Sequence, residues 1–384
     1  MKQRTKKFLL VLPILIFLAA YNAVPENVTV TQGQRLDFRW GITGEASTEQ
    51  TGEFDCCAKL LNFIPIKTVN VSVTPKFFVV PSGEAIGVKV HTDGVLVVGV
   101  GDVTGKDGKK SRPAAKAGIR EGDRIVSVNG EAVSDTSVFA KRINECDGEA
   151  ELKIIRDGTG MNVSVNAAYS EESGCYKVGM WVKDSTAGIG TLTFYNPENS
   201  TFGALGHAIC DSDTKTILTV GRGTVSPCRV KGSYKAENGE PGELFGDFGS
   251  EILGGITENC DIGIYGHARS IPKNSAVPVA SRFQVKQGAA QVICDIDGCG
   301  PKAYDIEITK ISKLPGASNK NFVITVKDPV LIEKTGGIIR GMSGSPILQN
   351  DMLVGAVTHV FVSDAKKGYG IFAENMLDMT FKIE

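Results

Sequence analysis

The second half of the chain is patterned for β-strands almost without interruption. From residue 165 to the C-terminus, short apolar runs are separated by Gly, Pro, Asn and Asp, the residues that favour turns. The chain has 45 Gly among its 384 residues, and no helical periodicity alternates with these runs. A βαβ fold is therefore disfavoured, and many short strands at regular spacing indicate a β-sandwich or barrel. We expect strands at residues 179–183, 188–195, 215–220, 291–294, 303–311, 322–326 and 353–362.

Residues 76–160 form a compact unit with a different order of elements. An apolar strand at 95–100 is followed by a Gly- and Lys-rich loop, a short helix at 113–119, a strand at 124–128 and a second helix at 134–146. Asn129-Gly130 is a strong signal for a hairpin turn. The stretch AAKAGIREGDRIVSVNGEAV in this unit resembles the most recognisable part of bacterial PDZ domains.

PDZ domains bind extended peptides, as C-termini or internal segments, by adding a strand to the edge of a sheet. The resemblance implies that Ile86, Gly87 and Val88 lie in the loop whose backbone N–H groups hold a terminal carboxylate. The alternative is that the PDZ-like unit is a structural spacer.

The N-terminus carries an export pattern. Four basic residues among the first seven precede an almost wholly apolar run over residues 8–21. The run is short for a transmembrane helix, which needs about 17–25 residues, and no clean small-x-small cleavage site follows it. We expect residues 1–25 to be an uncleaved signal anchor that attaches the chain to a membrane, with a cleaved signal peptide as the alternative. The remainder would then lie outside the cytoplasm, with residues 26–75 as a few strands and loops.

The balance of charge excludes one class of partner. The chain has 42 Lys and Arg against 43 Asp and Glu, a formal net charge of -1, so nucleic-acid binding has no electrostatic support. The nine Cys include no C-x-x-C pair, which weakens a zinc-ribbon or thioredoxin-like interpretation.

The strongest chemical signal is GMSGSP at residues 341–346. A serine nucleophile needs a sharp turn that presents its hydroxyl, and glycines permit the backbone angles of such a turn. In chymotrypsin-like peptidases a GxSGxP turn does this and aims two backbone N–H groups at the developing oxyanion. By that resemblance Ser343 is the nucleophile, Gly341 and Ser343 form the oxyanion hole, and residues 165–384 form a chymotrypsin-like double β-barrel. The alternatives are a Gly/Ser hairpin turn without chemistry and Ser345 as the nucleophile.

A serine needs a base to become a good nucleophile, and the chain has four His. His91 lies in the PDZ-like unit, and His359 follows the serine. His207, in FGALGHAICDSDT, has a Gly-flanked apolar setting upstream of Ser343, which is the order of chymotrypsin-like enzymes. We expect His207 to be the general base, with His267, in a second GHA tripeptide, as its chief rival.

The third group of such a site is an acid that orients the imidazole and stabilises its charge. From spacing alone, Asp247 or Asp261 suits the chymotrypsin-like order. The other candidates are Asp211, Asp213 and Asp328.

Four segments carry a more specific resemblance: WVKDSTAGIGTLTFYNP (181–197), FGALGHAICDSDT (202–214), EKTGGIIRGMSGSPI (333–347) and VGAVTHVFVSDAKKGYGIF (354–372). In these the chain is similar to the SpoIVB serine peptidases, family S55, of endospore-forming bacteria. The resemblance extends over the anchor, the PDZ unit and the peptidase domain. It implies that His207 and Ser343 are catalytic and that the family's aspartate, before EKTGG, is Asp328. This carboxylate would either orient His207 directly or shape the nucleophile loop.

The resemblance also implies a developmental role. Such a peptidase is exported to the forespore membrane, facing the space between the two membranes of the developing spore. It cleaves itself between anchor and PDZ unit, and it cleaves a regulator of an intramembrane metalloprotease that processes a late sigma factor. The acyl-transfer chemistry needs no metal or organic cofactor. Two alternatives stay open: a general quality-control protease of the HtrA kind, and a non-enzymatic PDZ adaptor.

Overall fold

The computed structural model describes residues 16–33, 36–38, 42–44, 48–105, 108–237, 239–312 and 319–383. Most of the expected anchor, residues 1–15, lies outside these described residues. Within them, no helix has the length and apolar character needed to cross a membrane. The chain divides into two compact units, Met1–Phe77 and Phe78–Glu384.

The first unit is a five-stranded sheet preceded by a helical segment at residues 16–23. Alternation along β5 places Val69, Val71 and Val73 on one buried face, where they pack with Ile42 and Ala58. The short strands expected between residues 26 and 75 are thus present. In spatial order they are β1 (Asn27–Thr31), β5 (Ile64–Thr74), β4 (Gly52–Leu60), β3 (Ile42–Gly44) and β2 (Asp37–Phe38), with β1 parallel to β5.

The second unit is organised around two long strands, β7 (Ala85–Val100) and β16 (Met180–Asn196), which pair with each other along most of their length. One end of the pair belongs to a barrel of six strands. Around this barrel β7 pairs with β18 (Val220–Tyr234), followed by β20 (Gly254–Cys260), β21 (Gly263–Ala268), β17 (Thr201–Ala204) and β16, which returns to β7. Further strands extend this sheet: β6 (Phe78–Pro81), β19 (Glu243–Phe248) and β22 (Val277–Pro278).

The prediction that Ile86, Gly87 and Val88 form a carboxylate-binding loop is wrong. These residues lie within β7, in the barrel, where Gly87 is opposite Ile189 on β16 and Ser226 on β18. Both edges of this stretch are occupied by neighbouring strands, and Ile86 and Val88 are buried in the barrel core. No free strand edge remains there for a peptide.

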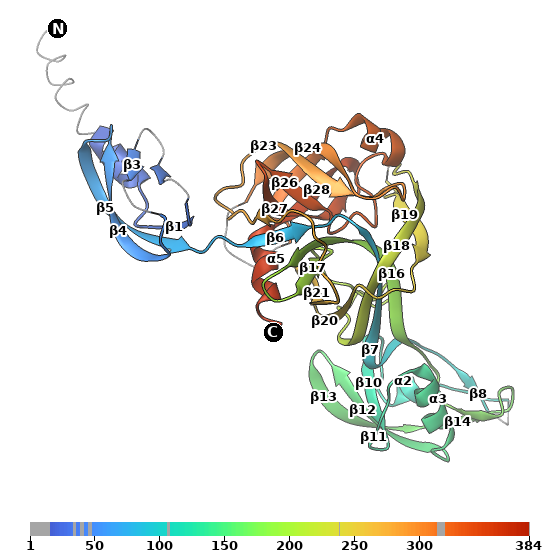
Figure 1. Ribbon diagram of the computed structural model, residues 1–384. Helices are drawn as coiled ribbons and strands as arrows, with labels where there is room; N and C mark the ends of the chain where they lie inside the picture. Colours follow the sequence, from blue (N-terminus) through green and yellow to red (C-terminus); the bar gives the residue numbers. More distant parts are fainter. Residues whose placement is uncertain are drawn as a thin grey trace, which may run out of the picture. The chain divides into compact units, whose positions relative to one another are not determined.

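The other end of the β7–β16 pair carries a lobe with its own core, which includes Val95, Phe139, Ile143 and Leu152. Figure 1 shows β7 leading into this lobe, beside α2 and α3. The two helices expected here are confirmed, and Asp135 caps α3, since its carboxylate accepts a hydrogen bond from the Val138 N–H at 2.9 Å. The lobe comprises β8 (Val103–Thr104), β9 (Lys110–Ser111), α2 (Pro113–Lys116), β10 (Arg124–Val128), β11 (Glu131–Ala132), α3 (Thr136–Asn144), β12 (Glu149–Arg156), β13 (Thr159–Asn166), β14 (Ala168–Ser170) and β15 (Cys175–Lys177).

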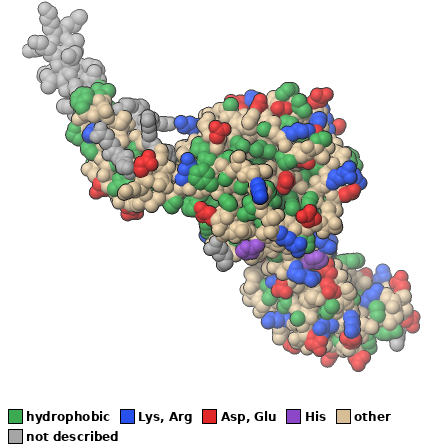
Figure 2. Space-filling model, in the orientation of Figure 1, with side chains coloured by type: hydrophobic (Ala, Val, Ile, Leu, Met, Phe, Trp, Pro, Cys, Tyr) green, Lys and Arg blue, Asp and Glu red, His purple; other side chains and the backbone are tan. Residues whose placement is uncertain are grey.

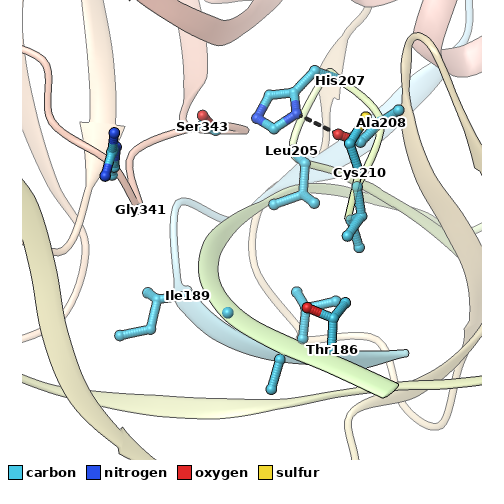
Figure 3. A pocket seen from close by; sticks show the side chains of 13 residues that line it. Thr186, Ile189, Leu205, His207, Ala208, Cys210, Gly341 and Ser343 are labelled. Atoms are coloured by element: carbon cyan, nitrogen blue, oxygen red, sulfur yellow. Dashed lines mark hydrogen bonds between the residues drawn. The ribbon is translucent and has the colours of Figure 1, made fainter. Parts of the chain in front are cut away.

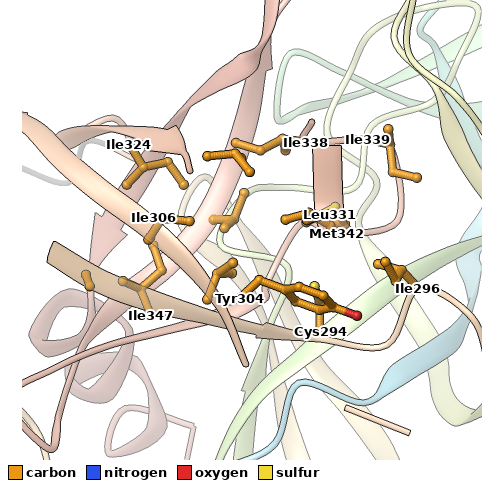
Figure 4. Close-up of a cluster of buried hydrophobic side chains, with 14 of the residues drawn as sticks. Cys294, Ile296, Tyr304, Ile306, Ile324, Leu331, Ile338, Ile339, Met342 and Ile347 are labelled. Atoms are coloured by element: carbon orange, nitrogen blue, oxygen red, sulfur yellow. The ribbon is translucent and has the colours of Figure 1, made fainter. Parts of the chain in front are cut away.

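A second closed barrel follows in the chain. Its core, shown in Figure 4, brings Ile306, Ile324 and Ile347 together with Leu331 and Met342. The mainly-β prediction is therefore confirmed. The barrel order is β23 (Gly288–Cys294), β24 (Lys302–Ile311), β25 (Phe322–Val326), β28 (Asp364–Phe372), β27 (Met352–Phe361) and β26 (Pro346–Gln349), with α4 (Pro329–Thr335) and α5 (Ala373–Thr380) outside the sheet.

One expected strand is absent. Over residues 211–219 only an isolated bridge between Cys210 and Ile217 forms, and β18 begins at Val220. The Asp211 carboxylate accepts hydrogen bonds from the N–H groups of Asp213 and Thr214 at 3.0 and 2.9 Å. Such local side-chain bonds give the backbone an alternative to a sheet ladder, so a turn forms instead.

Candidate active site

Ser343 and His207 line the same pocket, which has a volume of about 420 Å³. Figure 3 shows the two side chains next to each other at one side of the pocket. His91 and His267 are not among the pocket's residues. The other lining residues are Val88, Thr186, Ala187, Gly188, Ile189, Leu205, Ala208, Ile209, Cys210, Arg340 and Gly341.

The turn that carries Ser343 depends on two glycines. Gly341 and Gly344 have φ values of +96° and +94°, a region that residues with a Cβ rarely adopt. A Cβ on Gly344 would also lie 2.1 Å from the Thr191 carbonyl oxygen. Thr191, on β16, holds the turn by donating its N–H to the Ser343 carbonyl at 2.9 Å and its hydroxyl to the Gly341 carbonyl at 2.8 Å. The first barrel therefore fixes the turn that the second barrel presents.

The Ser343 hydroxyl donates a hydrogen bond to the Thr358 carbonyl at 2.9 Å, so it must rotate before it can give a proton to His207. The N–H groups of Gly341 and Ser343 donate to no other described residue, which leaves both available to an oxyanion. Ser345 is fully buried and donates to the Met342 carbonyl at 2.7 Å. Its lack of access makes Ser345 the poorer nucleophile candidate.

The His207 ring is held in one tautomer by the backbone. Its Nδ1 lies 2.8 Å from the Ala208 carbonyl, which can only accept, so Nδ1 carries the proton and Nε2 is free to act as a base. Figure 3 shows this second nitrogen on the side of Ser343. Burial lowers the pKa of His207 below 6.5, against a smaller opposing effect of the Ala208 carbonyl. The imidazole is therefore neutral at neutral pH.

The segment after His207 is fixed by Asn259 on β20. Its side-chain oxygen accepts from the Ile209 N–H at 2.8 Å, and its amide nitrogen donates to the carbonyls of Ile209 and Leu218 at 2.9 and 2.8 Å. These three bonds hold the backbone two residues from the base.

Sequence reasoning gave His359 no role, yet its ring centroid lies 5.0 Å from that of His207. Burial, and then the nearby His207, lower the pKa of His359 to about 4. Its Nδ1 is buried and has no hydrogen-bond partner among the described residues. The signal in the sequence was its position beside Thr358, on the strand that returns next to the nucleophile turn.

No carboxylate of the described residues contacts His207. Asp328 caps α4: its Oδ1 accepts the N–H groups of Val330 and Leu331 at 2.9 and 3.0 Å, and its Oδ2 accepts that of Asp305 at 3.4 Å. Asp213 forms an ion pair with Lys183, as Asp247 does with Lys231. The prediction that Asp328 orients His207 directly therefore does not agree with the geometry. The alternative is that Asp328 shapes the nucleophile loop. It agrees with the geometry, because α4, which Asp328 caps, ends shortly before that loop.

Asp261 is joined to the nucleophile by a path of hydrogen bonds. Its carbonyl accepts from the Asn319 side chain at 2.8 Å, and the Asn319 carbonyl accepts from the Thr358 hydroxyl at 2.8 Å. The Thr358 carbonyl in turn accepts from Ser343.

Comparison with known protein families gives two matches. Residues 85–167 match the PDZ domain family, and residues 174–377, more than half of the chain, match the SpoIVB peptidase S55 family. The chain belongs to the SpoIVB peptidase S55 family. The prediction of a serine peptidase is thereby confirmed, as is the presence of a PDZ domain.

Curated relatives of this S55 peptidase include probable periplasmic DegP-like serine endoproteases. That of Pseudomonas putida (strain GB-1) is 29% identical over 185 residues, covering 47% of this chain and 34% of the relative. That of Bartonella henselae is 49% identical over 55 residues, 14% of this chain and 11% of the relative. The chain thus spans about a third or less of the length of these relatives.

Solved structures show only distant likeness. The Rv3671c protease of M. tuberculosis, in an inactive form, is 16% identical with a TM-score of 0.30, over 51% of this chain and 84% of that one. The PDZ domain of an SdrC-like protein from Listeria monocytogenes is 20% identical with a TM-score of 0.19, over 23% of this chain and 87% of that one.

In this S55 peptidase, Asp328→Asn separates the two roles proposed for the aspartate. Asn caps helices about as well as Asp, so if Asp328 shapes the loop we expect peptidase activity to stay within about tenfold of wild type. Asp328→Ala removes the cap and is expected to lower the free energy of unfolding by about 0.5–2 kcal/mol. The measurement is kcat/KM together with chemical denaturation.

A loss of kcat by roughly 10⁴-fold in Asp328→Asn would instead assign the triad acid to Asp328, because that is the usual cost of the wrong histidine tautomer. Asp261→Asn is the matched comparison, because Asp261 also suits the spacing of a triad acid. The substitution keeps the backbone carbonyl through which the hydrogen-bond path joins Asp261 to the nucleophile, so it changes the carboxylate alone. A large loss there, with none at Asp328, would assign the acid to Asp261.

A pocket other than the catalytic one lies in the PDZ domain. It has a volume of about 460 Å³ and lies between α3 and the segment that leads into β16. It is lined by Phe139, Ala140 and Ile143 from the helix and by Met180 and Trp181 from the strand. Residues 180–183 pair with β7 on one edge, and no described strand pairs with their other edge. The residues before them, Val178-Gly179, show the same apolar-Gly order as Ile86-Gly87.

Proposed function

We propose that this chain is an endopeptidase with a chymotrypsin-like double β-barrel that uses Ser343 as nucleophile and His207 as general base. The observation that carries the proposal is the placement of both side chains in one pocket beside two unengaged backbone N–H groups. Membership of the S55 family supports the same chemistry.

The mechanism follows from the donors and acceptors present. The Ser343 hydroxyl turns away from the Thr358 carbonyl and gives its proton to Nε2 of His207 as Oγ attacks the peptide carbonyl. The N–H groups of Gly341 and Ser343 stabilise the oxyanion. His207 then passes the proton to the leaving amine, and water, deprotonated by the same imidazole, releases the acyl group. His359, neutral above pH 4, lies against the His207 ring without adding charge to it.

The biological role is a signalling cleavage in the developing spore. The protein would face the space between the two spore membranes, held by its N-terminal segment, cleave itself, and cleave a regulator of an intramembrane metalloprotease. The four segments that resemble SpoIVB peptidases support this role, as does the family match. The periplasmic DegP-like relatives support a location outside the cytoplasm.

The second candidate is general protein quality control, which the DegP-like relatives favour. Here the PDZ match precedes the peptidase match in the chain. Incubation with a panel of unfolded proteins separates the candidates: a quality-control enzyme degrades most of them, and a signalling enzyme cuts few sites.

The pocket beside α3 is the proposed site for a protein segment bound as an added strand. Because Trp181 lines it and is 64% exposed, we expect an apolar peptide to shift the Trp181 fluorescence to shorter wavelength. A Trp40→Phe background leaves Trp181 as the only Trp of the chain. Ala140→Arg should block the shift, and an unchanged shift in that variant would place the peptide elsewhere.

The catalytic proposal is tested by incubating the purified protein with a fluorophosphonate and mapping the modified peptide by mass spectrometry. Labelling of Ser343, together with self-cleavage between the anchor and the PDZ domain, is the expected result. A chain that neither labels nor cleaves would favour the adaptor alternative.

A further inference from the structure

One feature of the catalytic pocket is its charge. Arg340 is the only lining residue that is charged at neutral pH, because burial keeps His207 neutral and no carboxylate lines the pocket. Most other lining side chains are small or aliphatic, with two hydroxyls, from Thr186 and Ser343, and one thiol, from Cys210. A single positive charge therefore marks an otherwise uncharged cavity.

The backbone of Arg340 is held firmly while its side chain is left free. Its N–H donates to the Gly242 carbonyl at 2.8 Å, and its carbonyl accepts from the Leu244 N–H at 2.9 Å. The side chain is exposed, and its guanidinium forms no ion pair or hydrogen bond with a described residue. In this it differs from Arg156 and Arg282, which pair with Asp123 and Glu374. The guanidinium thus has its donors available to a bound molecule.

Arg340 lies close in the chain to the groups that would bind the reacting carbonyl. It immediately precedes Gly341, whose N–H is one of the two proposed oxyanion donors. Consecutive Cα atoms are about 3.8 Å apart, and a substrate strand rises about 3.3 Å per residue. The guanidinium can therefore reach substrate side chains only close to the cleaved bond. Figure 3 shows Gly341, the residue that follows Arg340, on the side of Ser343 away from His207.

A guanidinium in this setting recognises carboxylates. It offers a planar fork of donors that matches a carboxylate in two parallel hydrogen bonds, and a bound peptide excludes water from the pair. A Lys or Arg of the substrate at the same place would be repelled. We propose that Arg340 selects substrates that carry an acidic side chain within about two residues of the cleaved bond, an inference that rests on the proposed peptidase function.

The test uses the full chain and a synthetic peptide library randomised over eight positions, with cleavage sites read by mass spectrometry. Pairs of peptides with Glu or Lys at the preferred position then give kcat/KM ratios for wild type, Arg340→Gln and Arg340→Glu. We expect wild type to favour the Glu peptide by roughly 10- to 100-fold, the range of one charge-assisted pair. Arg340→Gln should bring the ratio close to one, and Arg340→Glu should invert it.

The matched control is Arg269→Gln, which removes an exposed guanidinium from the end of β21, outside the pocket. It should keep the wild-type ratio, since the effect is local. The proposal is overturned if wild type cleaves without charge preference, or if Arg340→Gln keeps the preference of wild type. If wild type neither cleaves the library nor labels with fluorophosphonate, the peptidase function itself fails, and the selection with it.

Discussion

Replacing Ser343 with Ala is expected to lower kcat/KM for peptide hydrolysis by roughly 10⁴- to 10⁶-fold, because no other group can form the acyl intermediate. The fold should survive. The Ser343 hydroxyl makes one hydrogen bond, to the Thr358 carbonyl, and such a bond contributes about 1 kcal/mol. Self-cleavage followed by intact mass, beside a melting curve, measures both effects in one preparation.

Ser345→Ala is the matched control, two residues away in the same turn. It removes a buried hydroxyl that bonds to the Met342 carbonyl, so we expect a loss of about 1–3 kcal/mol in the free energy of unfolding. Fluorophosphonate labelling should persist in Ser345→Ala and vanish in Ser343→Ala. Labelling that persists in Ser343→Ala and vanishes in Ser345→Ala would make Ser345 the nucleophile. The Gly341–Pro346 turn would then not present Ser343 for attack.

His207→Ala should be almost as damaging as the loss of the serine, because nucleophile and base act as one unit. In wild type, kcat/KM should fall on acidification with a midpoint below pH 6.5. The direction follows from burial, which lowers the pKa of His207 and so keeps the base unprotonated to lower pH than a free imidazole. The measurement is a pH profile of kcat/KM with a fluorogenic peptide.

Two controls keep this profile interpretable. His267→Ala changes the rival imidazole, which lies on β21 outside the pocket, and should leave the acid limb where it is. Stability must be followed in parallel because of His359. Its pKa of about 4 is lower than the 6.5 of an unfolded chain, so the unfolded state binds more protons between these values and stability falls as pH drops from 6.5 towards 4. An acid limb that coincides with unfolding, or lies above pH 6.5, would contradict the assignment of His207.

The parts of the site that could be predicted from sequence are those encoded locally. The turn around Ser343 needs glycines at 341 and 344 for backbone angles that other residues resist, and that need is visible in six consecutive letters. The strands at 303–311 and 322–326 were visible because their period of two extends over several residues. The short helix α4 was not, since seven residues show too little helical periodicity.

What sequence could not supply is the relation between distant segments. His359 meets His207 only because β27 returns beside the nucleophile turn, and no local pattern records that contact. In sequence, Asp328 can be a catalytic acid or a helix cap, because a carboxylate before Pro329 suits either role. Residues 86–88 show the apolar-Gly-apolar pattern of a PDZ loop, but pairing on both edges makes them part of a barrel wall.

Because β7 and β16 belong to both the barrel and the PDZ lobe, the lobe is an insertion between two paired strands. It is not a separate domain joined to the barrel by a single linker. Strands of 16 and 17 residues leave the barrel together, hold the lobe at their far end, and return as neighbours. A truncation from either terminus would therefore remove strands of the barrel before it reached the lobe. A peptidase without its lobe would be made by an internal deletion that rejoins the paired ends of β7 and β16 through a tight turn.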